Sequence, residues 1–419
     1  MSQKARMILT LLLLTLCLLG SLGFGRFSFG AILPFMKDDL MFTYTQTGFV
    51  ASSIFFGYLL SAFFSGYFVL RFTAKVVIIA SLCLASLGMS LLAMSSHFWI
   101  SFFGSLIMGI GSGGANIPAL GVVAKWFAPK KRGLAMGIVN SGSGLGIVFS
   151  GVFVPVMIGI DTVNGWRFSW IVLACLILLI AILVLAFLKK HPQEVGIHSN
   201  GEERNQTSDH TFLATSSVYK NSIVWHIGFT YFLWGFSYLV FSTFIVDYLM
   251  NDIGFTKGVA GQYFAIGGFI SIFSGFIWGA ISDKIGRIQA LTIVYGYQCI
   301  LLLLMSLTYH PTLLLVEVIL YGIALWAVPT ITVTSVSEYV EPALAPIALG
   351  FLTLFFGVGQ FFSPIVTGIL IDQTNSYYSA FVASAIAVCV GCFASWALSM
   401  RLSRKSERVI SSNINRVDN

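Results

Sequence analysis

Charged residues are scarce in this chain, and their scarcity excludes an ordinary soluble fold. Only 9% of the 419 residues are Asp, Glu, Lys or Arg, 57% are hydrophobic, and the mean hydropathy is +0.90. Soluble domains carry about 25% charged residues, so this composition indicates a protein of the lipid bilayer. The net charge of +7 then marks one side of a membrane, and we expect no nucleic-acid partner.

Motifs of soluble enzymes are also missing. The six cysteines all fall inside apolar runs, so no disulfide framework is expected. No Gly-x-x-x-x-Gly-Lys-Ser/Thr loop for ATP is present, and the glycines between Gly109 and Gly114 follow no strand and so do not indicate a dinucleotide site. The six histidines lack metal-ligand spacing. We therefore expect that the protein is not an enzyme and that it binds no metal and no cofactor.

Twelve apolar runs are long enough to cross a bilayer, which takes about 20 helical residues. They lack the alternation of barrel strands, and a backbone in lipid must pair its own hydrogen bonds, so we predict an all-α membrane protein with twelve transmembrane helices. The first run is too long for a signal peptide and is expected to be retained. The runs are Met7–Phe35, Gly48–Leu70, Val76–Met94, Phe98–Ala124, Gly133–Ile160, Phe168–Leu188, Ile223–Met250, Gly258–Ile281, Ala290–Thr308, Thr312–Val336, Ala345–Ile371 and Tyr377–Met400.

The positions of lysine and arginine predict the topology. Of the 23 such residues, all except Lys37, Arg167, Lys257 and Arg26 fall in the terminal segments or in alternate connections. This asymmetry places both termini in the cytoplasm of a multi-pass protein of the plasma (inner) membrane. The predicted domains are a six-helix bundle at 1–188, a flexible cytoplasmic linker at 189–221, a second six-helix bundle at 222–400, and a basic cytoplasmic tail at 401–419, loose along the inner leaflet.

A charged segment between two apolar runs recurs in the chain. Gly279–Arg287 reads Gly-Ala-Ile-Ser-Asp-Lys-Ile-Gly-Arg, and an offset of 213 positions places Gly66 under Gly279 and Arg71 under Lys284. The pattern Gly-x-x-x-Asp-Lys-x-Gly-Arg, recurring in both halves, resembles the loop motif of the major facilitator superfamily of secondary transporters. The same offset aligns Asp39, Phe42, Thr43 and Gly48 with Asp252, Phe255, Thr256 and Gly261, and Ala135 and Gly137 with Ala348 and Gly350.

The resemblance implies the major facilitator fold, in which two pseudo-symmetric bundles rock around a central site near the midplane. It also implies a cytoplasmic gate. In the first copy, Leu70 and Thr73 stand where the motif has Asp and Gly, which weakens any gating role there. The predicted gate residues are Gly279, Asp283, Lys284, Gly286 and Arg287, with Gly66 and Arg71 from the first copy.

A second resemblance concerns the substrate. The glycines at Gly109–Gly146, with Lys125-Trp126-Phe127 and later Gly165-Trp166-Arg167, are similar to the oxalate–formate antiporter and monocarboxylate porter branch. This similarity favours organic anions over drugs. The substrate-binding cations of that branch lie on its eighth and eleventh helices, and here those runs carry none, so those roles do not transfer.

Arg26 is the strongest candidate for an anion-binding residue. It lies eight residues before Pro34, about 12 Å inside the outer end of the first helix at helical rise. A guanidinium at that depth suits bidentate binding of a carboxylate, and the resemblance adds that several organic-anion branches place an arginine on the first helix. The alternative is a structural cation bonded to backbone carbonyls or paired with Glu317, or one that snorkels outward.

Glu317 is the candidate for proton coupling. A buried carboxyl can carry a proton, whereas an acid near a helix end can instead reach water. Asp247, His226 and Trp166 are expected to lie at the membrane interface.

Polar and aromatic residues within the other runs predict a substrate-binding lining. Tyr231, Trp234 and Tyr238 share one face of the seventh helix at i, i+3 and i+7. The alternative for each residue is ordinary contact between helices. The remaining predicted lining residues are Tyr58, Asn116, Asn140, Gln262, Tyr321 and Gln360.

These observations predict a secondary active transporter that works by alternating access and moves a small organic anion, a carboxylate, together with protons. The expected partners are the lipid bilayer, a small anionic substrate and protons, and we expect a monomer. Efflux of a hydrophobic or drug-like compound is the alternative, favoured if Arg26 is dispensable. A non-transporting membrane sensor is a further alternative, but the linker is too short for a folded signalling domain.

Overall fold

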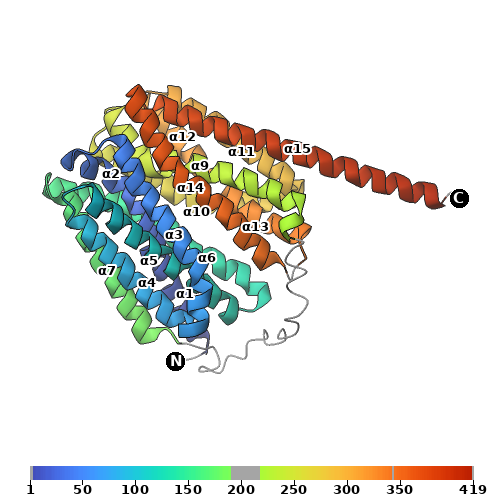
Figure 1. The fold of residues 1–419 in the computed structure, drawn as a ribbon, viewed down its shortest axis with the longest axis horizontal. Coiled ribbons are helices and arrows are strands. Elements are labelled where there is room, and N and C mark those ends of the chain that lie inside the picture. The colour runs from blue at the N-terminus through green and yellow to red at the C-terminus, as the bar shows by residue number, and fades with distance from the viewer. Residues whose placement is uncertain (1–2, 190–217, 342–343, 418–419) are drawn as a thin grey trace. The chain divides into compact units, whose positions relative to one another are not determined.

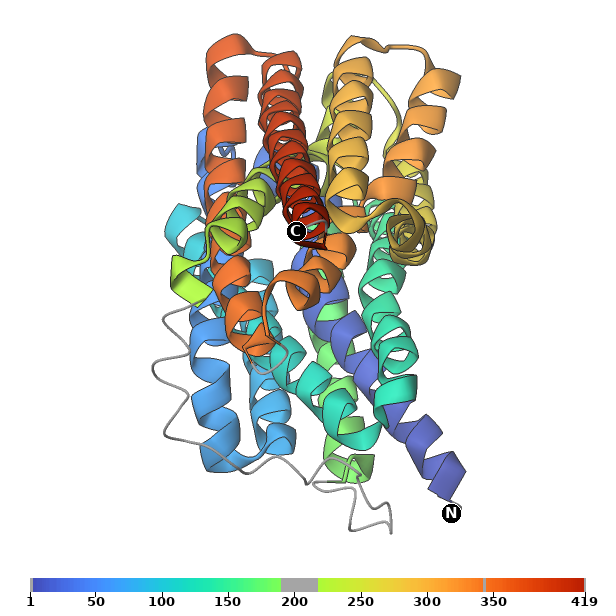
Figure 2. The same cartoon turned by 90° about the vertical axis from the view of Figure 1, so that its right-hand side faces the viewer.

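Helices make up the structure throughout. The computed structural model describes residues 3–189, 218–341 and 344–417, and this part of the chain contains helices and no strand (Figures 1 and 2). Within these ranges, twelve helices are long and apolar enough to span a membrane. The predicted fold class and number of spans are therefore confirmed. The predicted linker falls largely on residues 190–217, outside the described residues.

The elements follow the predicted runs closely. They are α1 (Gln3–Leu18), η1 (Leu19–Phe27), α2 (Ser28–Asp39), α3 (Tyr44–Phe72), α4 (Ala74–Ala93), α5 (Phe98–Trp126), α6 (Pro129–Ile160), α7 (Gly165–Phe187), α9 (Ser222–Asn251), α10 (Lys257–Ile285), α11 (Arg287–Leu307), α12 (Pro311–Ala324), α13 (Ala327–Tyr339), α14 (Ala345–Thr374) and α15 (Tyr378–Val417).

Three features differ from the sequence-based expectation. The first span is interrupted by η1, a π-helical segment. The tenth span is broken between α12 and α13, at Leu325 and Trp326. The last helix is longer than the predicted twelfth run, because α15 continues through Val417 (Figure 1). The loose association of this tail with the inner leaflet stays a prediction.

Local sequence explains where several helices begin. At the start of α3, the Thr43 hydroxyl accepts a hydrogen bond from the Gln46 N–H, and the Gln46 side chain accepts one from the Thr43 N–H. This capping box satisfies two donors that a helix start leaves open. Gly286 precedes α11 with φ +94°, and Thr73 occupies the equivalent place before α4 with φ +74°. The duplication in sequence is thus repeated in backbone conformation.

Contacts divide the chain into two compact units. The first comprises Met1–Gln206, Leu239–Ile272 and Gln360–Ala380. The second comprises Thr207–Tyr238, Phe273–Gly359 and Phe381–Asn419. The division by sequence into two six-helix bundles stays a prediction.

Glycines explain why parts of α9, α10 and α14 belong to the first unit. A Cβ on Gly30 would lie 2.5 Å from the Ser242 carbonyl oxygen, and one on Gly151 would lie 2.6 Å from that of Gly261. A Cβ on Gly48 would lie closer still to the carbonyl oxygen of Pro364. Only residues without a side chain allow these backbones to approach so closely.

Candidate functional site

The candidate site in the first unit starts from the π-helical segment η1, which carries Arg26 at its end. Gly20, Gly23 and Gly25 lie in this segment. A Cβ on Gly23 would be 2.7 Å from the Gly146 Cα, so η1 packs directly on the backbone of α6. π-Helical segments are rare and occur often at functional sites. The wider π-helical turn and the close contact between Gly23 and Gly146 together set the position of Arg26 in the first span.

Arg26 is surrounded by aromatic rings. The side chain is buried, with 7% exposed. Its guanidinium carbon lies 4.6 Å from the ring centroid of Phe55, 5.2 Å from that of Tyr58 and 5.5 Å from that of Phe27. A desolvated cation over aromatic faces gains about 2 kcal/mol. The rings hold the guanidinium in place without supplying a negative charge of their own.

Two further predicted residues join Arg26. The Asn116 amide of α5 donates a hydrogen bond of 2.8 Å to the Tyr58 hydroxyl of α3. Arg26, Tyr58 and Asn116 therefore form one group, called here the Arg26 group, drawn from three spans. Sequence reasoning missed Phe55, although it lies three residues before Tyr58 and so on the same face of α3.

An aromatic stack dominates the second unit. The ring centroids of Trp234 and Tyr238 are 4.5 Å apart at an interplanar angle of 7°, and Tyr231 stacks on Phe356 of α14 at 4.7 Å and 10°. Trp234 and Tyr231 are also stacked, at 5.8 Å. Trp326 meets the stack edge-on at 6.3 Å from Trp234. The predicted face of the seventh helix is therefore real, but Phe356 and Trp326 were not foreseen.

The break in the tenth span lies beside this stack. The N–H of Trp326 donates a hydrogen bond of 3.0 Å to the Ser274 hydroxyl of α10. This side chain satisfies a donor that the interrupted helix leaves open. Interrupted helices line substrate sites in many transporters. Tyr321, one turn before the break, is fully buried.

The remaining predicted amides differ in their exposure. Asn140 and Gln262 lie on exposed faces of α6 and α10, and within the described part of the chain neither side chain is hydrogen-bonded. Gln360 in α14 is 1% exposed.

Glu317 lies in the second turn of α12 and faces Thr308, which caps the end of α11. Its side chain is 7% exposed, and the Thr308 hydroxyl donates a hydrogen bond of 2.7 Å to its Oε1. Its Oε2 is buried without a hydrogen-bond partner among the described residues. A carboxyl held this way has one oxygen open to a proton.

The second copy of the loop motif forms an ion network in the second unit. Arg287 pairs with Asp283 one turn earlier, and its Nε lies 3.1 Å from Glu338 Oε1 in α13. It also donates to the Ser282 hydroxyl. Glu338 was not predicted as a partner, because it lies about fifty residues away in sequence.

The other predicted gate residues make fewer contacts. Lys284 is exposed, and Gly279 lies near Thr330 of α13. In the first copy, Gly66 and Arg71 are exposed, and Arg71 donates to the Tyr67 hydroxyl at 3.3 Å. Leu70 supplies no carboxylate for it.

Two residues expected at the membrane interface are buried. Trp166 is 1% exposed, and its indole N–H donates to Asp39, which also pairs with Arg167 at 2.6 Å. Asp247 is 0% exposed. Position near the end of a span does not reveal burial, because neighbouring helices and loops cover these side chains.

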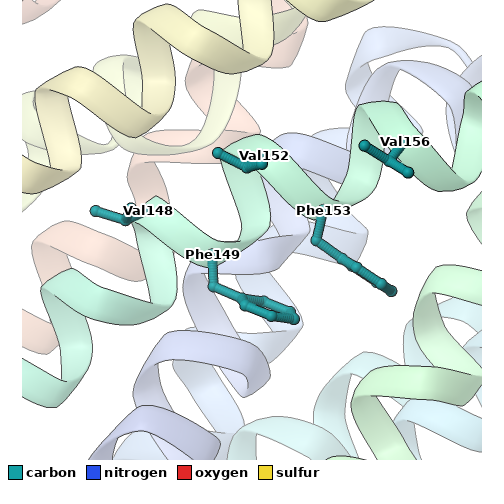
Figure 3. A pocket seen from close by; sticks show the side chains of 5 residues that line it. All are labelled: Val148, Phe149, Val152, Phe153 and Val156. Carbon is teal, nitrogen blue, oxygen red and sulfur yellow. The ribbon is translucent and has the colours of Figure 1, made fainter.

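Two of the hollows formed by the described residues lie in the first unit, and neither is lined by Arg26, Tyr58 or Asn116. One, of about 370 Å³, is lined along α6 by Val148, Phe149, Val152, Phe153 and Val156, as Figure 3 shows. The other, of about 610 Å³, lies between α3, α4 and α5 and is mostly apolar. Neither offers the charge an anion needs. Among the described residues, no three His, Cys, Asp or Glu side chains are placed to hold a metal ion.

Comparison with known proteins identifies the family. The family model described as Major Facilitator Superfamily matches residues 15–346. The chain therefore belongs to the major facilitator superfamily. It is a multi-pass membrane transporter and not an enzyme.

Individual relatives are more distant. A hexuronate transporter of Bacillus subtilis is 25% identical over 370 residues, covering 83% of this chain and 84% of the relative. A probable sulfoacetate transporter of Cupriavidus necator is 24% identical, covering 88% and 89%. A probable nitrate transporter of Staphylococcus aureus is 24% identical, covering 86% and 88%.

Among solved structures, a bacterial homologue of the human lysosomal transporter Spinster, in an inward-facing and unoccupied conformation, superimposes with a TM-score of 0.78 at 15% identity. The superposition covers 95% of this chain and 97% of that one. This likeness concerns the fold.

Proposed function

We propose that the protein is a secondary active transporter that moves a small organic anion, a carboxylate, by alternating access and in company with protons. The observation that carries this proposal is Arg26, a buried guanidinium on a π-helical segment, faced by Phe55 and Tyr58 and adjoined by the Asn116 amide.

The chemistry of the Arg26 group suits an oxyanion. A guanidinium offers a planar fork of donors that matches a carboxylate, and it holds its charge even when buried. The Tyr58 hydroxyl and the Asn116 amide add neutral polar atoms beside it. Hexuronate, sulfoacetate and nitrate, the compounds in the names of the three relatives, are all anions, which supports an anionic substrate.

Glu317 is the proposed proton-coupling residue. A carboxyl that is 7% exposed and holds one hydrogen-bonded oxygen tolerates the neutral form better than a solvated acid does.

We propose that Asp283, Arg287 and Glu338 act at the cytoplasmic gate, where contacts would break when the inner side opens. The aromatic stack of Tyr231, Trp234 and Tyr238 is proposed as a second substrate-binding surface.

The test is uptake into proteoliposomes of a labelled panel: glucuronate, galacturonate, sulfoacetate, nitrate, and small mono- and dicarboxylates, with and without an inward proton gradient. We expect saturable uptake of at least one carboxylate, driven by the gradient. Arg26→Gln should reduce it about 100-fold or more, because a buried charge partner of the substrate is lost. Arg26→Lys keeps the charge without the planar fork and should retain only part of it.

Arg401→Gln is the matched control, since Arg401 lies exposed in α15 and outside both the site and the gate, and it should transport normally. Glu317→Gln should retain exchange of the anion but lose accumulation driven by protons. If Arg26→Gln transports as the wild type does, the anion site is wrong and efflux of hydrophobic compounds becomes the better hypothesis.

A further inference from the structure

A second buried charged cluster lies in the first unit, at the ends of α2 and α9. Lys37 Nζ is 3.9 Å from Asp247 Oδ1, with side chains 11% and 0% exposed. The Asn251 amide donates to the same Oδ1 at 2.9 Å, and the Tyr377 hydroxyl donates to Oδ2. Lys37 Nζ also lies 4.1 Å from the Tyr44 ring centroid. These five residues are called the Lys37 latch.

The latch ties together segments that are far apart in the sequence. Lys37 and Tyr44 belong to the first and second spans, Asp247 and Asn251 to the seventh, and Tyr377 precedes the twelfth. The Tyr44 and Tyr377 rings meet edge to face at 5.8 Å. Asp372 of α14 adds to the closure, because it accepts hydrogen bonds from the N–H groups of Tyr44 and Thr45. Opening this end of the helices therefore requires the latch to separate.

The partners of Asp247 in this arrangement are those that an ionised carboxylate needs. A buried carboxylate needs a counter-charge and hydrogen-bond donors, and Asp247 has a lysine, an amide and a phenol. Protonation would remove the buried counter-charge of Lys37 and leave the largely buried ammonium group with only the exposed Asp38 beside it. Neutral Asp247 therefore favours separation of the latch.

The other titratable groups around Asp247 are less suited to this role. Asp38 lies 3.2 Å from Lys37 but is 62% exposed. Asp252 accepts the Tyr377 N–H at 3.3 Å, and burial raises the pKa of its carboxyl. The Tyr44 side chain also faces Asp247. Burial raises the pKa of the Tyr377 phenol, so Tyr377 is a neutral donor at ordinary pH.

We propose that Asp247 is a proton-binding site that controls this end of the transporter: the ionised carboxylate holds the Lys37 latch closed, and protonation from the adjoining aqueous side releases it. The distribution of lysine and arginine predicts that this side is the outside. Because the open state binds one more proton, opening increases as the pH falls, by up to about tenfold in the open-to-closed ratio per pH unit.

The test measures distance and needs no substrate, so its outcome is independent of the proposed anion transport. Spin labels are attached to p-acetylphenylalanine at Val163, an exposed residue between α6 and α7, and at Tyr378, which leaves the six cysteines intact. Both positions lie in the first unit. Electron–electron resonance in liposomes should show a short distance at about pH 8 and a growing longer population toward about pH 4.5, following one linked proton.

Asp247→Asn should give the longer distance at both pH values, because it mimics the neutral acid. The Lys37→Gln, Asp247→Asn double variant removes both charges and should fold without a pH response, which guards against misfolding of the single variant. Asp38→Asn and Asp252→Asn are matched controls and should respond as the wild type does. An unchanged distance distribution in the wild type, a retained response in Asp247→Asn, or a response abolished by Asp252→Asn would each overturn the proposal.

Discussion

At the scale of single residues, aromatic rings form much of the surroundings of the Arg26 guanidinium. Phe55, Tyr58 and Phe27 place ring faces over the guanidinium, and Asn116 holds the Tyr58 hydroxyl. Aromatic rings stabilise a buried cation without neutralising it. A carboxylate in their place would compete with an anionic substrate, so an aromatic setting suits an anion site.

Tyr58→Phe separates the ring of Tyr58 from its hydroxyl. The ring remains over Arg26, but the Asn116 donor loses its acceptor, which costs about 1 kcal/mol. We expect the KM for the transported anion to rise about fivefold with little change in the maximal rate. Tyr67→Phe is the control, because Tyr67 lies on the same helix but is 59% exposed. Equal effects in both variants would show that the Tyr58 hydroxyl has no part in the site.

At the scale of elements, the two copies of the loop motif share a turn with a positive φ, and only the second copy has the glycine that suits it. Gly286 adopts φ +94° without cost, whereas Thr73 adopts φ +74° with a β-branched side chain. The Thr73 hydroxyl oxygen is also buried with no hydrogen-bond partner in the described part of the chain. The first copy therefore keeps the turn that the motif requires despite losing its glycine.

Thr73→Gly should stabilise the protein by about 1 kcal/mol, because it removes a strained residue in the left-handed region. Gly286→Ala should destabilise it, since a Cβ there is strained and meets the Gln289 side chain. The apparent melting temperature in detergent should rise for the first variant and fall for the second. Gly121→Ala is the control, because a Cβ at that position meets nothing within 4 Å. A lower melting temperature for Thr73→Gly would contradict the strain argument.

At the scale of the whole molecule, the chain is a duplicated twelve-span transporter whose charge asymmetry predicts its orientation. Lys37, Arg167 and Lys257, the exceptions to that asymmetry outside Arg26, each have a local partner. Arg167 pairs with Asp39, Lys37 with Asp247, and Lys257 donates to the Ile158 carbonyl. They are therefore structural cations at one end of the helices and do not weaken the positive-inside assignment.

The predicted orientation is tested with protease sites inserted after Gly201 and after Thr162. Cleavage after Gly201, in the predicted cytoplasmic linker, should occur in inside-out vesicles and be blocked in right-side-out vesicles. Cleavage after Thr162, in the turn between α6 and α7, should show the opposite pattern. The reverse pattern at both sites would mean that the charge asymmetry has been misread.

The sequence by itself determined the spans, the duplication and the superfamily. A helix in lipid must satisfy its own backbone, so length and hydropathy identify each span without knowledge of its neighbours. Helical spacing placed Tyr231, Trp234 and Tyr238 on one face of α9, and the depth of Arg26 in the first span marked it as a candidate site residue.

Only the tertiary structure decided which residues meet. The partners of Arg26, Arg287 and Asp247 lie on other helices, as with Phe55, Glu338 and Lys37. Burial of Asp247 and Trp166, the π-helical turn at Arg26 and the break at Trp326 all depend on packing between distant segments. Hydropathy is a property of one segment, whereas these contacts are properties of several segments packed together.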